Sequence, residues 1–296
     1  GPPAVYDELR TPGAARTVVF YAHYDGQPVD PSQWTGAPFT PVFRDGSLAA
    51  GAKVIPPPLP GQRVDGESRI YARSASDDKA AIIAMLGALD ALRAASIAPS
   101  VNLKFFFEGE EEAGSAHLRR MLQMHADLLR ADAWVFCDGP VHQSGRQQVV
   151  FGARGVMGLE LTTYGPTRAL HSGHYGNWAP NPAVLMATLI ASMRDDDGRI
   201  TIAHFADDVR PISAAERVAL GALPTTDTTL RKALEMGATE ANNAPLAERI
   251  MLPALNVRGI KVGGVRELAA NAIPTEASAS IDFRLVPDQK PERVRE

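Results

Sequence analysis

Acidic side chains and one histidine gather in three short stretches of this chain. These stretches read AHYDG at 22–26, SDDK at 76–79 and EGEEEAGS at 108–115. Each stands where an apolar run ends or a helical pattern begins. Carboxylates and a neutral imidazole are the ligands that a two-metal hydrolytic site requires. The residue types therefore predict a hydrolase with two divalent ions.

The elements that position these residues alternate between strand and helix. Residues 17–22 and 101–107 predict buried strands because they are short, apolar, and rich in β-branched or aromatic residues. Residues 79–95 and 113–129 predict helices, and residues 133–137 predict a third strand. This order indicates an α/β fold, with a mostly parallel sheet flanked by helices.

Ligands of open α/β sheets bind at the carboxyl ends of the strands. His23 and Asp25 follow the first strand, and their spacing allows an imidazole on a metal with a carboxylate on its other nitrogen. Asp138 follows the third strand. Three adjacent glutamates, 110–112, follow the second strand, where like charges raise one another's pKa unless a cation neutralises them.

Each stretch taken alone has an ordinary alternative. His23 and Asp25 would then be a capped strand end with a solvated carboxylate. Asp77 and Asp78 would be N-capping acids at a helix start, where the helix dipole favours negative charge. The glutamates would be acids in a first helical turn. The coincidence of such residues at every strand end favours the metal site.

The pattern changes after about residue 151. Residues 152–164 predict a strand, 181–193 a helix capped by Asn181, and Ser213 with Glu216 a capping box. Residues 276–284 alternate between apolar and polar, which predicts a half-exposed antiparallel strand. We therefore expect two domains, with the metal-binding part in residues 1–151 and an α+β domain in residues 152–296.

Composition excludes several classes of protein. The 296 residues carry a net charge of −4 without a basic run, which argues against a nucleic-acid partner. No apolar stretch approaches the ~20 residues of a membrane span. The single Cys137 excludes an internal disulfide and fits a cytoplasmic protein, with a periplasmic or secreted one as the alternative. The chain starts at Gly1 without a visible targeting segment, and we expect both ends to be incomplete.

Five stretches carry a resemblance to a known family. They are FYAHYDGQPVDPSQW at 20–34, YARSASDDKA at 71–80, FEGEEEAGS at 107–115, LHSGHYG at 170–176 and IDFRLVPDQ at 281–289. In this order the chain resembles the M20 metallopeptidases, and among them the carnosinase-like dipeptidases. The resemblance implies a catalytic α/β domain interrupted by a lid domain through which two subunits form a homodimer.

The resemblance also implies roles for individual residues. His23 and Asp138 would bind the first metal and Glu112 the second, with Asp77 bridging both. Asp25 would orient His23. The resemblance further implies that Glu111 is the general base that activates the water between two metal ions, and that the Asp77–Asp78 peptide bond is cis. Zinc fits the imidazole and carboxylate ligands, with manganese or cobalt as alternatives.

Three further residues receive roles from the same resemblance. His171 of the lid would stabilise the tetrahedral oxyanion in the active site of the other subunit. Arg284 would bind the terminal carboxylate of the substrate, and Asn271 would also contact the substrate. Without the family, His171 reads as a solvated loop histidine and Arg284 as a strand residue paired with a neighbour.

This chain also departs from the family pattern. Ala72, Ser74 and Ala80 stand where the family usually has glycine, and a proline-rich insertion follows the first motif. The family's last metal ligand is a histidine after the lid, and no histidine follows His204. Either the sequence is truncated or the second metal site is degenerate.

Three functions remain open at this point. The first is a metallopeptidase that acts as a dipeptidase or carboxypeptidase on short peptides with a free C-terminal carboxylate. The second is an N-acyl amino acid amidohydrolase of the deacetylase or desuccinylase type. The third is a non-catalytic family member that binds peptides or serves as a scaffold.

Overall fold

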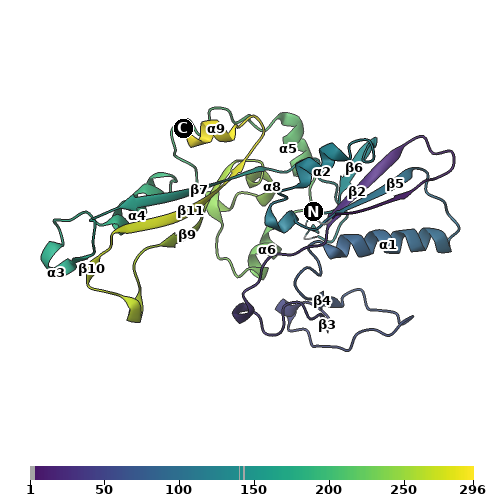
Figure 1. Cartoon of the computed structure of the whole chain (residues 1–296), viewed down its shortest axis with the longest axis horizontal. Coiled ribbons are helices and arrows are strands. Elements are labelled where there is room, and N and C mark those ends of the chain that lie inside the picture. The colour runs from purple at the N-terminus through teal and green to yellow at the C-terminus, as the bar shows by residue number, and fades with distance from the viewer. Residues whose placement is uncertain (1–3, 140, 143) are drawn as a thin grey trace. The chain divides into compact units, whose positions relative to one another are not determined.

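A computed structural model describes residues 4–139, 141–142 and 144–296. The chain divides into two compact units, Gly1–Pro140 and Val141–Glu296, here called the N-terminal and C-terminal units. Figure 1 shows the elements of each unit along the chain. In the described part of the chain, no helix is long and apolar enough to cross a membrane.

The N-terminal unit is built on a four-stranded sheet with the strand order β1-β5-β2-β6. Its strands are β1 (Ala4–Leu9), β2 (Thr17–His23), β5 (Asn102–Glu108) and β6 (Ala133–Phe136). β2 pairs in parallel with both β5 and β6, whereas β1 pairs antiparallel with β5. The predicted parallel arrangement is therefore confirmed for three strands, and β1 is an additional antiparallel strand that local patterning did not predict.

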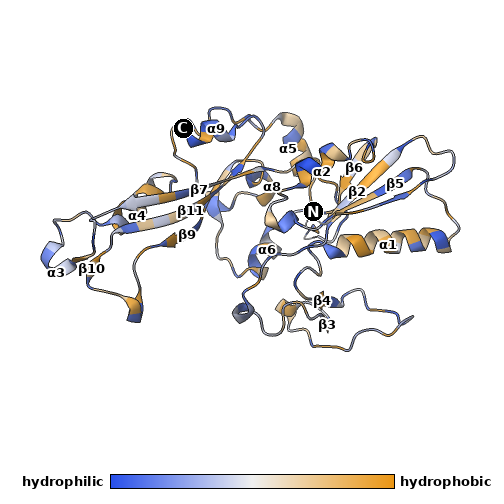
Figure 2. Cartoon of the chain, in the orientation of Figure 1, coloured by the Kyte–Doolittle hydropathy of each residue, from blue (hydrophilic) through white to orange (hydrophobic). Residues whose placement is uncertain are grey.

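Two helices accompany this sheet. α1 (Lys79–Ala94) contacts β2 and is apolar along most of its length, with Lys79, Asp90 and Arg93 as its charged residues (Figure 2). α2 (Leu118–Met124) lies against the opposite apolar face, where Val19, Tyr21 and Phe106 form a buried cluster with Leu129. These contacts fix the direction of β2 and β5 and so the place where their last residues emerge.

The predicted helix over 113–129 is wrong in extent. A 3-10 turn, η3 (Glu111–Ala113), ends at Gly114, and α2 begins only at Leu118. Gly114 has a φ of 89° and Ser115 a φ of 50°, both in the left-handed region, which a continuous right-handed helix cannot include. The glutamates therefore lie on a turn before the helix.

The loop over 28–68 contains structure that its composition did not predict. β3 (Val42–Arg44) pairs antiparallel with β4 (Arg69–Tyr71), and two 3-10 turns, η1 (Pro31–Gln33) and η2 (Leu48–Ala50), flank β3. Most of this segment is exposed, as expected for a surface loop.

The C-terminal unit contains a three-stranded antiparallel sheet with the order β7-β11-β9. Its strands are β7 (Gly155–Tyr164), β9 (Ala254–Lys261) and β11 (Glu276–Leu285). The alternating residues of β11, Ala277, Ala279, Ile281 and Phe283, are buried as predicted, and α4 (Pro182–Ser192) packs against them. Asn181 caps α4 as expected.

The remaining elements of this unit are short. α5 (Ala214–Gly221) has the predicted capping box between Ser213 and Glu216. The small ribbon of β8 (Leu170–His171) and β10 (Ala272–Ile273) lies beside α3 (Ser172–Tyr175) (Figure 1). The other elements are α6 (Asp227–Ala233), α7 (Glu240–Asn243), α8 (Leu246–Arg249), η4 (Arg266–Leu268) and α9 (Pro291–Arg295).

Candidate metal centre

His23 is the buried centre of the predicted site. It is the last residue of β2 and is only 1% exposed. Its Nδ1 atom lies 3.1 Å from Oδ1 of Asp25, and its Nε2 atom lies 3.0 Å from Oδ1 of Asp77. The imidazole is therefore held on one side and presents its other nitrogen to the carboxylates.

Further carboxylates face the same nitrogen. Nε2 of His23 lies 3.9 Å from Oε2 of Glu111 and 3.8 Å from Oδ2 of Asp138. Ligand atoms of His23, Asp77 and Glu112 lie within 4.8 Å of one another, as do those of His23, Asp78 and Asp138. The structure thus brings the predicted metal ligands His23, Asp77, Glu112 and Asp138 close to Glu111, the residue predicted to be the general base.

Asp25 connects two elements of the site. Its Oδ1 atom faces the ring of His23, while its Oδ2 atom accepts a hydrogen bond of 3.0 Å from the backbone amide of Glu112. Gln27 also holds Glu112, because its backbone and side-chain amides both donate to that carboxylate. Sequence reasoning missed Gln27, since nothing in local spacing reveals a partner 85 residues away.

The side chain of Asp78 does not make the contact that its place in the sequence suggests. It stands at the N-cap of α1, but its side chain makes no capping hydrogen bond. Instead its Oδ2 atom accepts from the backbone amide of His23 at 3.2 Å, and the residue is 4% exposed. The Asp77–Asp78 bond is cis, as the resemblance implied. The ordinary N-capping interpretation is therefore wrong for Asp78, which is also a potential metal ligand that the sequence prediction did not include.

Several carboxyl groups of the site are harder to ionise than in water, because nearby basic groups do not offset their burial. Burial raises the pKa of Asp78 to about 6, and nearby Asp138 adds to the shift. Burial also raises the pKa values of Glu111 and Asp138. Burial alone would lower the pKa of His23, but the carboxylates of Asp138 and Glu111 outweigh it and raise that pKa.

The donor set fits divalent cations. One imidazole nitrogen and several carboxylate oxygens are borderline to hard ligands, of the kind that zinc, manganese and cobalt accept. A bound cation would favour the charged carboxylates that now resist ionisation. Because Nε2 of His23 can bind one ion only, a second ion would be held by carboxylates alone among the described residues.

A buried hydrogen-bonded pair, Tyr21 and Glu108, lies next to His23. The hydroxyl of Tyr21 donates a hydrogen bond of 2.7 Å to Oε2 of Glu108, which is fully buried and stands beside His23 in the parallel register. The pKa of Tyr21 is raised, by burial and by this carboxylate. The other oxygen of Glu108 has no partner among the described residues. Neither residue received a role from the sequence, because Tyr21 lies within a predicted buried strand and Glu108 is only the first acid of the stretch 108–115.

His171 and Asn271 lie together in the C-terminal unit. His171 pairs with Ala272 across the ribbon, and the carbonyl oxygen of Asn271 accepts a hydrogen bond from the amide of Ser172. Nδ1 of His171 accepts a hydrogen bond of 3.1 Å from the amide of Gly173. This acceptor role places the ring proton on Nε2, so that the imidazole presents an N–H donor.

Arg284 is not near this ribbon. Glu276, the first residue of β11, closely follows β10 of the ribbon, and Arg284 lies eight residues further along β11. At the rise of an antiparallel strand, Arg284 is therefore about 27 Å from Glu276. Nε of Arg284 donates to Oδ2 of Asp282 at 3.1 Å, as the interpretation without the family had it. The structure therefore joins His171 and Asn271 and places Arg284 apart from them within one chain.

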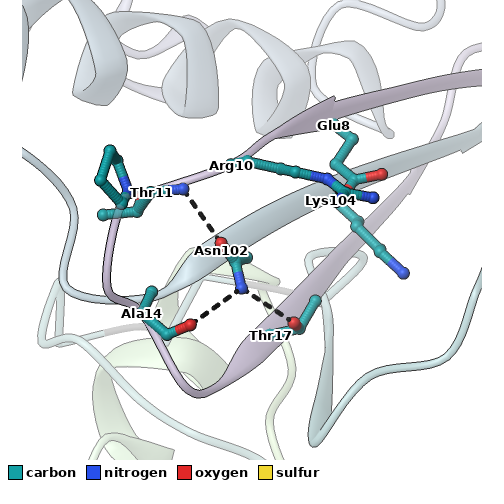
Figure 3. A pocket seen from close by; sticks show the side chains of 8 residues that line it. Glu8, Arg10, Thr11, Ala14, Thr17, Asn102 and Lys104 are labelled. Atoms are coloured by element: carbon teal, nitrogen blue, oxygen red, sulfur yellow. Dashed lines mark hydrogen bonds and ion pairs between the residues drawn. The ribbon is translucent and has the colours of Figure 1, made fainter.

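A separate pocket lies at the other end of the sheet in the N-terminal unit. It has a volume of about 540 Å³, and its lining includes Thr17 and Asn102, the first residues of β2 and β5 (Figure 3). The amide of Asn102 is already bonded, because it accepts from Thr11 and donates to Ala14 and Thr17. This pocket is distinct from the acidic centre, which stands at the strands' carboxyl ends.

Comparisons with known proteins identify similar sequences. Residues 19–256 match the sequence profile described as "Peptidase family M20/M25/M40". The chain is 26% identical over 298 residues to the Cys-Gly metallodipeptidase dug1 of Schizosaccharomyces pombe, covering 99% of this chain and 58% of that protein. It is 25% identical to the human Beta-Ala-His dipeptidase, covering 97% of this chain and 53% of that protein.

Solved structures agree with this likeness. An M20 family metallo-carboxypeptidase from Sulfolobus solfataricus superposes with a TM-score of 0.76 at 33% identity, over 99% of this chain and 62% of that chain. Human carnosine dipeptidase 1 superposes with a TM-score of 0.72 at 26% identity, over 99% of this chain and 59% of that chain. The chain thus spans little more than half the length of the curated relatives that it matches.

Proposed function

Because this chain belongs to the peptidase family M20/M25/M40, we propose that it carries the metal centre and lid of a metal-dependent dipeptidase. Its substrates would be dipeptides or short peptides with a free C-terminal carboxylate. The observation that carries this proposal is the buried imidazole of His23, which faces the carboxylates of Asp77, Glu111 and Asp138. We assign the catalytic part to residues 1–151 and the lid to residues 152–296.

The residues that would hold the ions are those gathered around His23. His23 and Asp138 would hold one ion and Glu112 the other, with Asp77 shared and Asp78 at hand. We propose zinc for both sites. Such ions lower the pKa of a coordinated water and polarise a substrate carbonyl.

Glu111 is the residue that moves the proton. Its carboxylate is partly exposed and lies beyond hydrogen-bonding distance of Nε2 of His23, so the imidazole does not occupy it. Burial raises its pKa, which brings its proton affinity closer to that of a general base working near neutral pH. Glu111 would accept the proton of the attacking water and deliver it to the leaving amine.

Two lid residues would complete the reaction. His171 presents an Nε2–H donor suited to the oxyanion, and Arg284 presents a guanidinium suited to the substrate carboxylate. The separation of about 27 Å along β11 argues against both acting on one substrate within a single chain. This supports a homodimer in which His171 serves the site of the partner subunit. The scarcity of cysteine supports the cytoplasm as the compartment.

The test measures metal content and hydrolysis together. The protein would be assayed with the dipeptides Cys-Gly and β-Ala-His and with N-acetyl and N-succinyl amino acids, with and without a chelator. Glu111→Gln should retain the metal and lose about 10²-fold or more in rate. Glu110→Gln is the matched control, because Glu110 is the neighbouring acid and pairs with His117 outside the centre.

Each outcome decides between the functions. Hydrolysis of dipeptides that a chelator and Glu111→Gln both abolish would establish the dipeptidase. Hydrolysis of N-acyl amino acids alone would replace it with an amidohydrolase. If no substrate is hydrolysed after metal is resupplied, the dipeptidase and the amidohydrolase are both excluded and a peptide-binding scaffold remains.

A further inference from the structure

A second arginine, Arg154, lies near the end of β11 at which Arg284 stands. Nη1 of Arg154 donates a hydrogen bond of 3.2 Å to the carbonyl oxygen of Leu252. Arg154 directly precedes β7, and Leu252 lies just before β9. Since β11 lies between β7 and β9, the side chain of Arg154 reaches across the end of β11.

The strand register places this side chain next to Arg284. Arg284 stands opposite Val156 on β7 and opposite Ala254 on β9. Arg154 and Leu252 each lie two residues before those partners, so they are diagonal neighbours of Arg284, within reach of a long side chain.

The charges at this end of the sheet are not balanced. Asp282 is 10% exposed at its side chain, and its Oδ2 atom accepts from Arg284 and, at 3.4 Å, from Nδ2 of Asn256. It is the only carboxylate within ion-pair distance of either guanidinium in the described chain. Two adjacent guanidinium groups with one carboxylate leave one positive charge. Burial and the nearby charge of Arg284 accordingly lower the pKa of Arg154.

The donors that remain are suited to an anion. Arg284 uses Nε on Asp282, and its two Nη groups have no partner among the described residues. Arg154 uses Nη1 on Leu252 and has no other partner among them. We propose that Arg154 is a second specificity-determining residue, which binds the substrate carboxylate together with Arg284, while Asp282 positions the guanidinium of Arg284. This inference rests on the proposed function, and it defines the substrate class as peptides with one free carboxylate at this end.

The test is a binding measurement that needs no metal and no turnover. The 296-residue chain would be titrated in a chelator with N-acetyl-L-alanine and with N-acetyl-L-alaninamide, which differ only in the carboxylate. The wild-type chain should prefer the acid, and Arg154→Gln should weaken acid binding about tenfold, which corresponds to about 1.4 kcal/mol. Amide binding should not change. Arg258→Gln, an exposed arginine of β9, is the matched control and should change neither.

A spectroscopic measurement on the wild-type chain tests the proposal even if the Arg154→Gln variant does not fold. In the wild-type chain, the ¹⁵N–¹H signals of the Nε groups of Arg154 and Arg284 should both shift with the acid and not with the amide. Arg154→Lys keeps the charge without the planar fork and should bind the acid less tightly than wild type does. The inference is overturned if acid and amide bind equally, if Arg154→Gln behaves like Arg258→Gln, or if only the Arg284 signal shifts.

The two hypotheses fail separately. A chain that prefers the acid through Arg154 but never hydrolyses a peptide would overturn the proposed function alone. A chain that hydrolyses dipeptides without any contribution of Arg154 to carboxylate preference would overturn the present inference alone.

Discussion

The hydroxyl of Ser74 donates a hydrogen bond of 2.7 Å to the backbone carbonyl oxygen of Asp25. Ser74 is 5% exposed and has a φ of 63°, in the left-handed region that favours glycine. The resemblance to the family implies a glycine at this position. The hydrogen bond therefore compensates for the backbone conformation and ties the segment before α1 to Asp25, whose carboxylate contacts His23.

Substitutions at Ser74 should separate these two contributions. Ser74→Ala loses the hydrogen bond and keeps the unfavourable φ, so the free energy of unfolding should fall by about 1 kcal/mol. Ser74→Gly loses the same bond but relieves a backbone cost of about 1 kcal/mol, and should remain close to wild type. Urea unfolding of both variants measures the difference. Equal destabilisation by both would show that the backbone cost is negligible.

Gly26 and Ser74 should be coupled. A Cβ atom at Gly26 would collide with Oγ of Ser74, and Cβ of Ser74 would be 3.1 Å away. Gly26→Ala should therefore lower the free energy of unfolding by about 1–3 kcal/mol. In a Ser74→Gly background only Cδ of Arg73 remains near, at 3.7 Å, and most of the loss should disappear. A double-mutant cycle measures this coupling, and strictly additive effects would contradict it.

The metal-free protein should become less stable as pH rises. The folded-state pKa of Asp78 is raised to about 6, so its contribution is present below its unfolded pKa and is lost as pH rises through the folded value. The raised pKa values of Glu111, Asp138 and His23 act in the same direction. The urea midpoint measured in a chelator should therefore decrease as the pH is raised through about 6.

Two controls accompany this pH series. Asp78→Asn removes the titrating group and should flatten the slope, whereas added zinc should restore stability at the higher pH by binding the ionised carboxylates. A midpoint that rises with pH in the chelator would show that these carboxylates are not destabilising when ionised.

The ring of His171 should carry its proton on Nε2. Long-range ¹H–¹⁵N correlation spectra distinguish the two tautomers of a neutral histidine directly. Gly173→Ala would place a Cβ atom 3.1–3.2 Å from the ring of His171, and should disturb the hydrogen bond and mix the tautomers. A pure Nδ1–H tautomer in the wild-type chain would exclude the amide of Gly173 as the fixing group.

Local patterns predicted the elements that carry the site better than the contacts within it. β2, α1, α4 and β11 follow directly from apolar periodicity and capping residues. The predicted helix over 113–129 was too long because a left-handed turn at Gly114 has no signature in apolar periodicity. β1 was not predicted because it is a largely exposed strand at the edge of the sheet, and only its pairing with β5 defines it.

The gathering of acids around His23 could be predicted because the carboxyl ends of parallel strands meet at one edge. The roles of Asp78, Gln27 and Glu108 could not, since each depends on a hydrogen bond to a residue 55 to 87 positions away. The neighbourhood of Arg154 and Arg284 needs the register of three strands, which no single segment encodes.

Asp25 divides its two carboxylate oxygens between the ring of His23 and the backbone of Glu112. A designer who grafted this centre onto another scaffold by copying the ligands alone would leave an imidazole free to rotate and a glutamate on an unanchored turn. The transferable unit is instead the end of β2 together with η3, spaced so that one aspartate spans both. Replacing Asp25 would disturb His23 at the end of β2 and Glu112 on η3 at once, so a redesign has to treat the two elements together.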